Sequence, residues 1–401
     1  MTKWKTYRLG DVIDKVIDNR GKSAPTSDEK YSPIIEINSI GDRNPNYDVV
    51  RKWVSKGTYD TWFRSGHPMI GDILIPTVGT IGIVSIMREN KGCIAQNIVA
   101  LRTNEKAHNL YLYYFLKSEY VKQELLNLNI GGVQPSIKVP HLLNLEISLP
   151  PLEEQRRIAG ILSAIDDIIE NNRRINTNLE LQAQALYKQW FVDNRSDDWE
   201  RKPLSEIAEF IGGYSYKGNE LVEASSTAMA TIKNFERKGG FKVDGFKDIV
   251  ASPKLKAEQH AKIFDILVAH TDLTQNADVI GNTEILLTCG GYTDIIFSMD
   301  LVKVLPKENF PYKFLLAAML KNPYFKAHCL GYVNGTTVLH MSKKALPEYV
   351  FACPSNEEAE KMDNAFKAYY QKMAEILQEN EALATLRDTL LPKLMNGEIK
   401  L

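Results

Sequence analysis

The amino-acid sequence contains one pattern twice, in the same order, at an offset of about two hundred residues. Four pairs of matching segments carry the repeat: Tyr7–Ile13 with Lys202–Ala208, Gly71–Ile75 with Phe264–Val268, Leu110–Leu116 with Tyr312–Ala318, and Leu149–Gln155 with Cys353–Ala359. Such repetition marks a chain built from one structural unit used more than once. With 401 residues the chain is also too long for a single ordinary core. A tandem duplication therefore constrains the fold more than any other feature.

Each copy ends in a long stretch with the spacing of an amphipathic helix, from Leu152 to about Asp193 and from about Asn356 to Met395. Apolar side chains recur there every three or four residues, as in a helix that packs along one face. The expected contact seam comprises Ile158, Ile165, Asn172, Leu179 and Leu186 in the first helix and Met362, Tyr369, Ile376, Leu383 and Leu390 in the second. The same apolar stripes also contain Ile161, Ile168, Ile175, Phe366, Met373 and Leu386. Asn172 and Asn380 interrupt the stripes, and polar seam residues can fix helix register.

Connectivity gives the two helices an expected geometry. A helix of about 40 residues is roughly 60 Å long, which exceeds the width of a domain of this size and disfavours the alternative that each helix packs only on its own domain. The second helix can match the first only in the opposite direction, so we expect an antiparallel coiled coil with internal pseudo-two-fold symmetry that holds two heads apart. The expected domains are residues 1–150 (the first head), 151–195 (the central helix), 196–353 (the second head) and 354–401 (the distal helix).

Each head has the pattern of a mixed α/β domain, so the expected fold class is α+β. Glycine and proline separate short strand-like runs, which are Asp72–Thr77, Ile81–Met87, Ile98–Arg102, Leu145–Leu149, Ala230–Lys233, Ile263–Ala269, Glu284–Thr288 and Leu301–Leu305. Between these anchors the heads diverge, as Pro76–Gly82 and Ala269–Gln275 illustrate. A shared frame with divergent insertions is typical of two related scaffolds that recognise different ligand features, although drift alone produces the same pattern.

The composition is that of a soluble globular protein, with 44% hydrophobic and 25% charged residues. Met1–Arg8 lacks the apolar region of a signal peptide, and the most apolar run, Phe314–Leu320, is far shorter than the ~20 residues of a membrane span. We therefore expect a cytoplasmic protein without membrane contact. The four cysteines, Cys93, Cys289, Cys329 and Cys353, form no CxxC pair and are expected to be free thiols.

The charge distribution alone does not indicate a nucleic-acid ligand, which usually goes with a basic excess. The net charge is −1; the first head is mildly basic, with 19 Lys and Arg against 15 Asp and Glu, and the distal helix is acidic, with 6 against 9. If DNA is the ligand, another subunit has to supply part of the positive field.

Catalytic motifs are absent from the sequence. There is no phosphate-binding loop, HExxH, GxSxG or GxGxxG pattern, and the seven histidines form no pair with metal-ligand spacing. Asn44–Tyr47 and Asn322–Phe325 are similar to the Asn-Pro-Pro-Tyr motif of amino-methyltransferases, but each lacks the second proline and a glycine-rich cofactor loop. Gly79–Gly82 has the shape of a nucleic-acid clamp, although a hairpin turn explains it better. No catalytic or metal-binding residue is therefore expected.

Several segments together resemble one known family. Leu149–Ala159, with its Pro-Pro-Leu-Glu-Glu-Gln-Arg-Arg core, closely resembles the start of the central conserved helix of specificity (S) subunits of type I restriction–modification systems. Gly131–Ile137 resembles the glycine–glutamine segment near the end of a target recognition domain, and Asn334–Met341 is a variant of it. Leu386–Ile399 and Trp4–Val12 resemble the end of the distal helix and the beginning of the first recognition domain. The departure is Asn356–Lys361, where the second copy lacks the glutamine and arginine.

This resemblance implies two target recognition domains, each of which reads half of a split double-stranded DNA site from the major groove. It implies that the paired helices set the spacing between the half-sites and bind two modification (M) subunits. The M subunits carry S-adenosylmethionine-dependent adenine methylation, and restriction subunits carry ATP- and Mg²⁺-dependent translocation and cleavage. The chain itself is then a non-catalytic subunit without a cofactor of its own.

Candidate DNA contacts follow from residue type, because base edges and phosphates are bound by basic and small polar side chains on loops. In the first head we predict contacts from Arg20, Lys22, Arg43, Asn44, Lys52, Arg64, Thr77, Thr80, Gln134, Ser136 and Lys138. In the second head we predict contacts from Tyr214, Tyr216, Lys217, Lys233, Asn234, Arg237, Lys238, Thr336, Thr337 and His340. The segments around Gln134 and Thr336 are favoured because the resemblance marks the same place in both heads, with a structural turn as the alternative.

Two other functions are compatible with the sequence. A coiled-coil scaffold whose heads bind protein or another non-DNA ligand has the same architecture, and salt-dependent, sequence-selective duplex binding separates it from a DNA reader. A standalone methyltransferase requires S-adenosylmethionine binding by this chain, which calorimetric titration detects.

Overall fold

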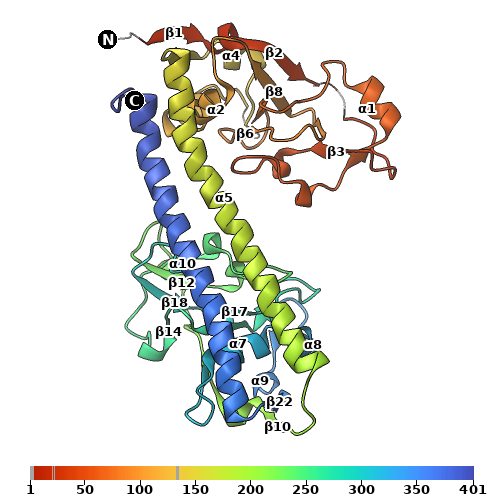
Figure 1. The fold of residues 1–401 in the computed structure, drawn as a ribbon, viewed down its shortest axis with the longest axis vertical. Coiled ribbons are helices and arrows are strands. Elements are labelled where there is room, and N and C mark those ends of the chain that lie inside the picture. Colours follow the sequence, from red (N-terminus) through yellow and green to blue (C-terminus); the bar gives the residue numbers. More distant parts are fainter. Residues whose placement is uncertain (1–3, 20, 22, 132–134) are drawn as a thin grey trace. The chain divides into compact units, whose positions relative to one another are not determined.

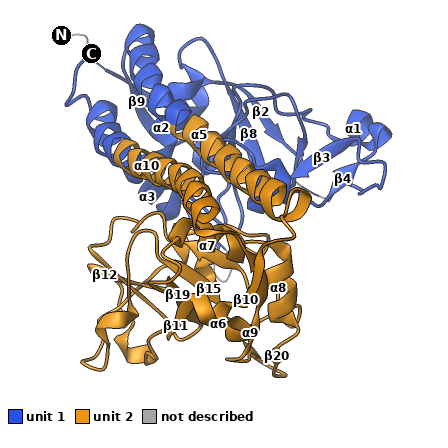
Figure 2. Ribbon diagram, turned by 60° about the horizontal axis from the view of Figure 1, so that its bottom comes forward, with its two compact units in different colours: residues 1–168, 384–401 blue, residues 169–383 orange. Residues whose placement is uncertain are grey.

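The computed structural model describes residues 4–19, 21, 23–131 and 135–401, which form two compact units (Figure 2). Unit 1 contains residues 1–168 and 384–401, and unit 2 contains residues 169–383. Each unit therefore consists of one head and a segment of both long helices. The four domains predicted from the sequence treat each long helix as a separate part, whereas the two units group residues by their contacts. The four-domain division therefore stays a prediction.

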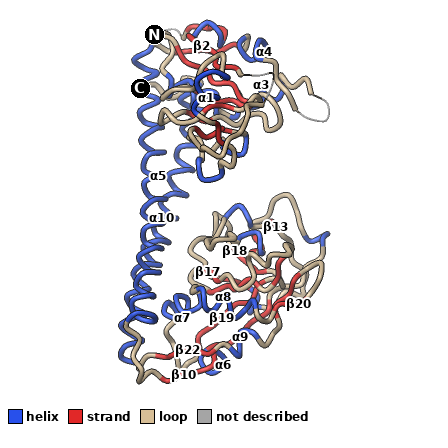
Figure 3. The backbone as a smooth tube through the Cα atoms, turned by 90° about the vertical axis from the view of Figure 1, so that its right-hand side faces the viewer, coloured by secondary structure: helices blue, strands red, loops and turns tan. Residues whose placement is uncertain are grey.

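The two long helices are α5 (Leu152–Lys188) and α10 (Asn356–Met395), which lie side by side (Figures 1 and 3). Both begin at the residues expected from the sequence, just after prolines and with acidic residues in the first turn, where the helix dipole favours negative charge. The regular part of α5 ends at Lys188, and Gln189–Asp193 continues as one turn of π-helix. In unit 2 the helices are antiparallel, since Asn172 meets Asn380 while Asn176 meets Met373.

The two asparagines that interrupt the apolar stripes meet each other. The Asn172 side-chain amide donates to Oδ1 of Asn380 at 3.0 Å and to the Glu379 carboxylate at 3.0 Å. A buried polar group of this kind is satisfied in only one alignment of the helices, so the pair specifies the register. Of the other predicted seam residues, Ile158, Ile165, Met362 and Ile376 are buried, whereas Leu179, Leu186, Tyr369, Leu383 and Leu390 are half-buried.

Four residues of the expected stripes lie outside the seam, namely Ile161, Ile168, Ile175 and Leu386, which are all exposed. Leu162 and Ile169 face inward instead of Ile161 and Ile168, and Asn176 faces α10 instead of Ile175. Periodicity cannot separate these choices, because both members of the pairs 161–162 and 168–169 are apolar.

The first head contains nine strands and four short helices among its described residues. Its strands are β1 (Lys5–Arg8), β2 (Ile13–Asp18), β3 (Ser32–Ile35), β4 (Trp53–Val54), β5 (Ile73–Pro76), β6 (Ser85–Ile86), β7 (Cys93–Ile94), β8 (Ile98–Thr103) and β9 (Glu146–Leu149). Its helices are α1 (Lys56–Trp62), α2 (Asn109–Lys117), α3 (Glu119–Asn127) and α4 (Val139–Leu143). The sheets have the strand orders β2-β8-β5-β6, β4-β3-β7 and β1-β9.

The second head has the same plan with additional strands. Its strands are β10 (Glu200–Pro203), β11 (Ala208–Gly212), β12 (Thr227–Ala230), β13 (Lys247–Asp248), β14 (His260–Ala261), β15 (Ile266–Ala269), β16 (Thr271–Asp272), β17 (Thr283–Ile285), β18 (Asp294–Phe297), β19 (Leu301–Pro306), β20 (Val333–Asn334), β21 (Leu339–Met341) and β22 (Val350–Cys353). Its helices are α6 (Leu204–Ile207), α7 (Lys313–Leu320), α8 (Pro323–Leu330) and α9 (Ala345–Glu348).

The strand orders of the second head repeat those of the first. They are β11-β19-β15-β17, β13-β12-β18-β14 and β10-β22, with β16-β21-β20 as a further sheet. In both heads a parallel strand pair, β3 with β7 and β12 with β18, lies in a sheet that is otherwise antiparallel. The shared topology confirms the α+β duplication.

Several sequence-based expectations need correction. The predicted strand Ile81–Met87 is a strand only at Ser85–Ile86, and the predicted strand Glu284–Thr288 ends at Ile285. The predicted strand Ala230–Lys233 is wrong after its first residue, because the strand ends at Ala230 and the Thr231 side chain caps a 3-10 turn over Ile232–Asn234. The sequence repeat paired Leu110 with Tyr312, but the structure aligns the apolar helices α2 and α7 with a shift of two residues from that pairing. Since α2 begins at Asn109 and α7 at Lys313, Leu110 corresponds to Phe314.

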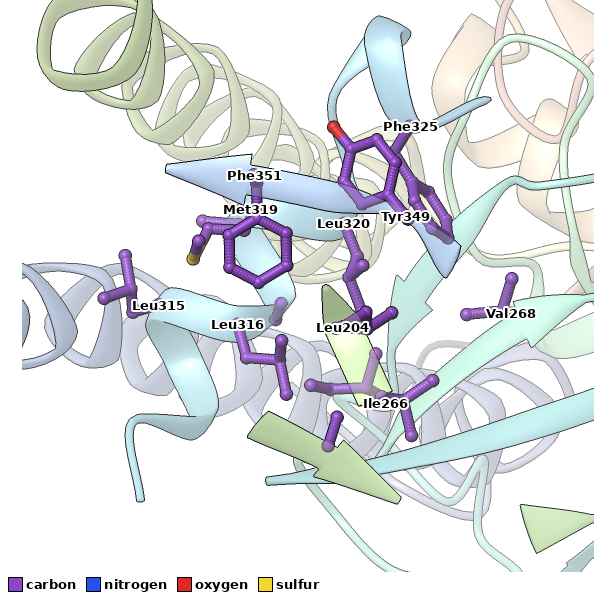
Figure 4. Close-up of a cluster of buried hydrophobic side chains, with 14 of the residues drawn as sticks. Leu204, Ile266, Val268, Leu315, Leu316, Met319, Leu320, Phe325, Tyr349 and Phe351 are labelled. Carbon is purple, nitrogen blue, oxygen red and sulfur yellow. The ribbon is translucent and has the colours of Figure 1, made fainter. Parts of the chain in front are cut away.

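Each head shares one hydrophobic core with the helices. In unit 1 the α2 aromatic residues pack with Ile158 and Leu162 of α5 and with Leu394 of α10. In unit 2 Leu316 and Leu320 of α7 pack against Ile266 of β15 (Figure 4), and the same core extends to Phe366 and Tyr370 of α10. Burying one such leucine contributes about 2 kcal/mol, so these cores tie the heads to the helices.

In unit 1 an ion pair, largely shielded from solvent, links the two long helices. Arg387 of α10 donates to Asp166 of α5 at 2.8 Å, and the hydroxyl of Tyr114 donates to the same carboxylate at 2.7 Å. Burial and this carboxylate raise the pKa of the Tyr114 hydroxyl above its usual value, so it remains a proton donor. The three groups join the head, the central helix and the distal helix.

Replacing Asp166 by alanine should therefore lower the stability of unit 1 by about 3 kcal/mol, because it leaves a largely buried guanidinium without its buried partner. The midpoint of urea unfolding, followed by circular dichroism, measures the loss. The matched control is Asp388→Ala, which removes an exposed carboxylate from the same arginine and should cost less than about 0.5 kcal/mol. Equal losses for the two variants would contradict the assignment.

Candidate DNA interface

In the first head, two segments predicted to contact DNA lie together. The chain after β5 pairs with the segment before α4: Ile137 N–H donates to Thr77 O at 2.8 Å, and Gly79 N–H donates to Pro135 O at 2.8 Å. Val78 and Ser136 form a β-bridge between these bonds. Thr80 and Lys138 are exposed beside this pairing, whereas Ser136 is half-buried.

The second head repeats this backbone pairing with different side chains. Met341 N–H donates to His270 O at 2.9 Å, which matches the bond between Ile137 and Thr77. Strand β16 pairs with β21, so that Thr271 lies opposite His340. The exposed residues here are Thr336, Thr337 and His340, and the Gln275 side chain donates to Thr336 O at 2.6 Å. We call these two pairings the recognition loops.

One glycine shapes the recognition loop of the second head. Gly335 has a φ of +119°, and a Cβ at this position would lie 2.3 Å from Val338 O. Only glycine tolerates both conditions, so it allows the tight turn that exposes Thr336 and Thr337.

Burial lowers the pKa of the neighbouring His270, and His340 and Lys343 lower it further, which keeps the His270 imidazole neutral at neutral pH.

A charged hollow adjoins the recognition loop of the second head. Its cationic lining residues are Lys233, Arg237, Lys238 and Lys242. Leu273 and Thr274, which follow β16, line the same hollow and connect it to the recognition loop. Four carboxylates, from Glu236, Asp244, Asp272 and Asp278, line it as well and balance the four cations, and Arg237 pairs with Asp278 at 3.4 Å. The structure thus brings together two of the three groups of residues predicted in this head.

Sequence reasoning missed Leu273, Gln275 and Lys242 at this place. The available signal was the divergence of Ala269–Gln275 from Pro76–Gly82. Leu273 is 66% exposed. The carbonyls of His270 and Thr77 accept equivalent hydrogen bonds, and Leu273 follows His270 by three residues, as Thr80 follows Thr77. A search restricted to polar residues does not detect it.

Four predicted contact residues are buried, which corrects the expectation that they face a ligand. Arg43 donates to Asp167 at 2.7 Å and to Ser163, both on α5, and thus holds the first head on the helix. The Thr77 hydroxyl donates to Asn97 O, and Asn234 caps its own turn through bonds to Thr231 and Lys242. These side chains organise the recognition frame from the inside.

Tyr214 is the fourth buried residue. Its hydroxyl donates to Glu220 at 2.6 Å, in a small core with Met229 and Ile296. This bond, with backbone donors including Lys217 N–H, lowers the pKa of Glu220 to about 2 despite some desolvation. The predicted neighbours Tyr216 and Lys217 flank this small core rather than the charged hollow.

The other predicted residues are dispersed or lie outside the description. Lys52 pairs with Glu36 at 2.7 Å, Arg64 is exposed, and Asn44 is half-buried. Arg20, Lys22 and Gln134 lie outside the described residues. The Asn-Pro pair at Asn322 caps α8, with Oδ1 accepting from Tyr324 N–H and Phe325 N–H.

Two general findings complete the site. Within the described part of the chain, no group of three or more His, Cys, Asp or Glu residues is placed to hold a metal ion. No helix among the described residues is long and apolar enough to cross a membrane.

Comparison with known proteins gives consistent results. The family model described as type I restriction modification DNA specificity domain matches residues 1–181. The type I restriction enzyme MjaIX specificity subunit of Methanocaldococcus jannaschii is 25% identical over 357 residues, which cover 82% of this chain and 78% of that protein. The HindI specificity subunit of Haemophilus influenzae is 23% identical, and the match covers 100% of both chains.

A solved structure supports the fold. The crystal structure of a type I restriction–modification S subunit from M. genitalium matches with a TM-score of 0.60 over 98% of this chain and 96% of that chain, at 18% identity. Residues 1–181 therefore match the type I restriction modification DNA specificity domain, and the chain is similar to type I specificity subunits along its full length.

Proposed function

We propose that the chain reads a split DNA sequence, one half with each head, as the specificity subunit of a type I restriction–modification complex. The observation that carries the proposal is the pair of recognition loops. The same backbone hydrogen bonds hold Thr80 and Lys138 in the first head and Thr336, Thr337 and His340 in the second. One frame with two sets of exposed side chains suits a protein that reads two different half-sites.

The exposed groups have the chemistry that base and phosphate contacts require. Hydroxyl and imidazole groups on the recognition loop of the second head donate to and accept from base edges, while an exposed leucine such as Leu273 suits the methyl group of thymine. The lysines of the charged hollow are placed beside that loop and bind phosphates without sequence preference. Specificity then comes from the loop, and much of the affinity comes from the hollow.

The proposal assigns the chemical steps to other subunits. Two modification subunits bind the chain and methylate adenine with S-adenosylmethionine, and restriction subunits use ATP and Mg²⁺. The chain itself is non-catalytic and holds none of these cofactors. Support comes from the names of two relatives matched over most or all of their length, which are specificity subunits of type I restriction enzymes.

Replacing Thr336, Thr337 and His340 by alanine should relax the sequence requirement at one half-site and leave the other unchanged. Each lost contact should weaken discrimination at its base by about 1–3 kcal/mol. Sequencing of methylated adenines in DNA treated with the complex of the chain and its modification subunits gives both half-sites and the spacer. The matched control, Thr80→Ala with Lys138→Ala, should relax the opposite half-site. Changes at both half-sites from either variant would contradict separate reading.

Replacing Lys233 and Lys238 by alanine should weaken duplex binding equally for specific and nonspecific sequences. The slope of log affinity against log salt should fall by about two, because roughly one counterion release is lost for each lysine. Titration of the same complex with duplex DNA over a range of salt concentrations measures this slope. Lys254→Ala with Lys262→Ala, two exposed lysines outside the hollow, should leave it unchanged. An unaltered slope in the variant that lacks Lys233 and Lys238 would show that the hollow does not contact DNA.

A further inference from the structure

The charged hollow of the second head receives two of its cations from one short loop. The loop, Glu236–Gly240, carries Arg237 and Lys238, which are exposed and line the hollow. A β-bridge between Phe235 and Phe241 closes the loop, and Phe235 is buried in the core of the head. The two cations therefore project from a turn whose base is fixed by the core.

Two buried side chains at and beside β17 hold the tip of this loop. The Asn282 amide donates to Glu236 O at 2.8 Å, and the Glu284 carboxylate accepts from Gly240 N–H at 2.6 Å. Asn282 is 7% exposed and Glu284 is 4% exposed. Gly239 and Gly240 have φ values of +90° and +119°. Because glycine permits many backbone conformations, these hydrogen bonds select the one that the loop adopts.

Lys321, which follows the last residue of α7, holds the Glu284 carboxylate in this place. Its ammonium pairs with Glu284 at 2.8 Å and with Glu180 of α5 at 3.0 Å, and its side chain is only 12% exposed. Burial alone lowers the pKa of Lys321, but the two carboxylates raise it above its usual value, so the ammonium stays charged. The ion pairs thus connect the central helix, through Lys321 and Glu284, to the loop.

The removal of this ammonium would change the anchor of the loop. Glu284 and Glu180 would then be neighbouring like charges without a cation between them, and a largely buried carboxylate without a partner is strongly unfavourable. Glu284 can relieve this only by turning toward solvent or by taking up a proton. The first change removes its hydrogen bond from Gly240 N–H, and the second weakens it, because a charged acceptor binds more strongly than a neutral one.

The first head has a lysine in the same place. In the alignment of α2 with α7, Lys117 at the end of α2 corresponds to Lys321. Lys117 donates to the Asp42 carboxylate at 2.7 Å and to Asp42 O at 3.0 Å. Asp42 and Arg237 lie at the same interval after the equivalent strands β3 and β12, so the lysine is linked to the same loop in each head. This recurrence marks the loop as a part that both heads fix in place.

We propose that Lys321 is a positioning residue for DNA binding, because it holds Glu284 against the loop that carries the two cations. Arg237 and Lys238 are thereby directed at the phosphate backbone. The inference rests on the proposed function, in which the cations of the charged hollow bind phosphates. Lys321 itself does not contact DNA in this arrangement, since two carboxylates occupy its ammonium. A loop that is already fixed loses less conformational entropy on binding than a flexible one, so the positioned cations bind more tightly.

The test compares Lys321→Met with Glu284→Gln, a milder change that leaves the lysine paired with Glu180. In the complex of the chain and its modification subunits, both variants should weaken duplex binding. Both should also lower the slope of log affinity against log salt by about one to two, because up to two cations lose their place at the phosphates. Neither should weaken binding further in a chain that already carries Arg237→Ala with Lys238→Ala, since residues that act through the same groups are not additive.

The matched control is Lys303→Met, which removes another largely buried lysine of the same head. Lys303 pairs with Asp265 at 3.6 Å, donates to His260 O at 2.7 Å and lies outside the hollow. This variant should lower the midpoint of urea unfolding and leave the salt slope unchanged. Circular dichroism shows whether each variant is folded, and Glu284→Gln alone decides the test if Lys321→Met is not. Folded variants that lose stability but bind duplex DNA with the wild-type slope would show that Lys321 only stabilises the head.

The outcomes separate this inference from the proposed function. A wild-type complex without salt-dependent duplex binding overturns both. If Arg237→Ala with Lys238→Ala lowers the slope while Lys321→Met and Glu284→Gln do not, only the positioning role is overturned. An unchanged slope in the variant that lacks the two loop cations also overturns it, because the loop then makes no phosphate contact. The same holds if Lys321→Met weakens DNA binding equally with and without those cations, since the lysine then acts elsewhere.

Discussion

The pairing of α5 with α10 is the interaction on which both units depend. The core of unit 1 contains Leu391 and Leu394 of the distal helix, and the core of unit 2 contains Ala183 of the central helix. Each head is therefore completed by a helix segment from the other copy of the repeat. Because apolar burial is the main driving force of folding, neither copy has a full core alone. The two copies of the repeat therefore have to fold together.

Polar contacts restrict this apolar pairing to one register. The Asn172–Asn380 bond in unit 2 and the Asp166–Arg387 ion pair in unit 1 are each satisfied in a single alignment of the helices. Apolar stripes alone tolerate sliding by one turn, whereas a displaced arginine or asparagine would be buried without a partner. Within each unit, the register of the two helices is thus fixed by side chains that add little to the apolar core.

The sequence was sufficient to predict the duplication, the helix starts at Leu152 and Asn356, and several strands of each head, because these depend on local patterns. It did not predict which apolar row of α5 faces α10, since Ile161 and Leu162 are equally apolar neighbours and only the partner helix decides between them. In the candidate interface the Thr336 segment was found from its place in the repeat. Arg43 and Asn234 were misjudged because residue type carries no information about burial, and Leu273 was missed because apolar contacts were not sought.

The strand pairs β1–β9 and β10–β22 close each head at its base. Lys5 lies opposite Leu149 and Glu200 opposite Cys353, so the chain enters and leaves a head through adjacent antiparallel strands. A segment whose two ends meet at one place can be exchanged between genes by recombination without altering the helices that follow it. A whole head can then be replaced as a unit, while the long helices on either side keep their sequence.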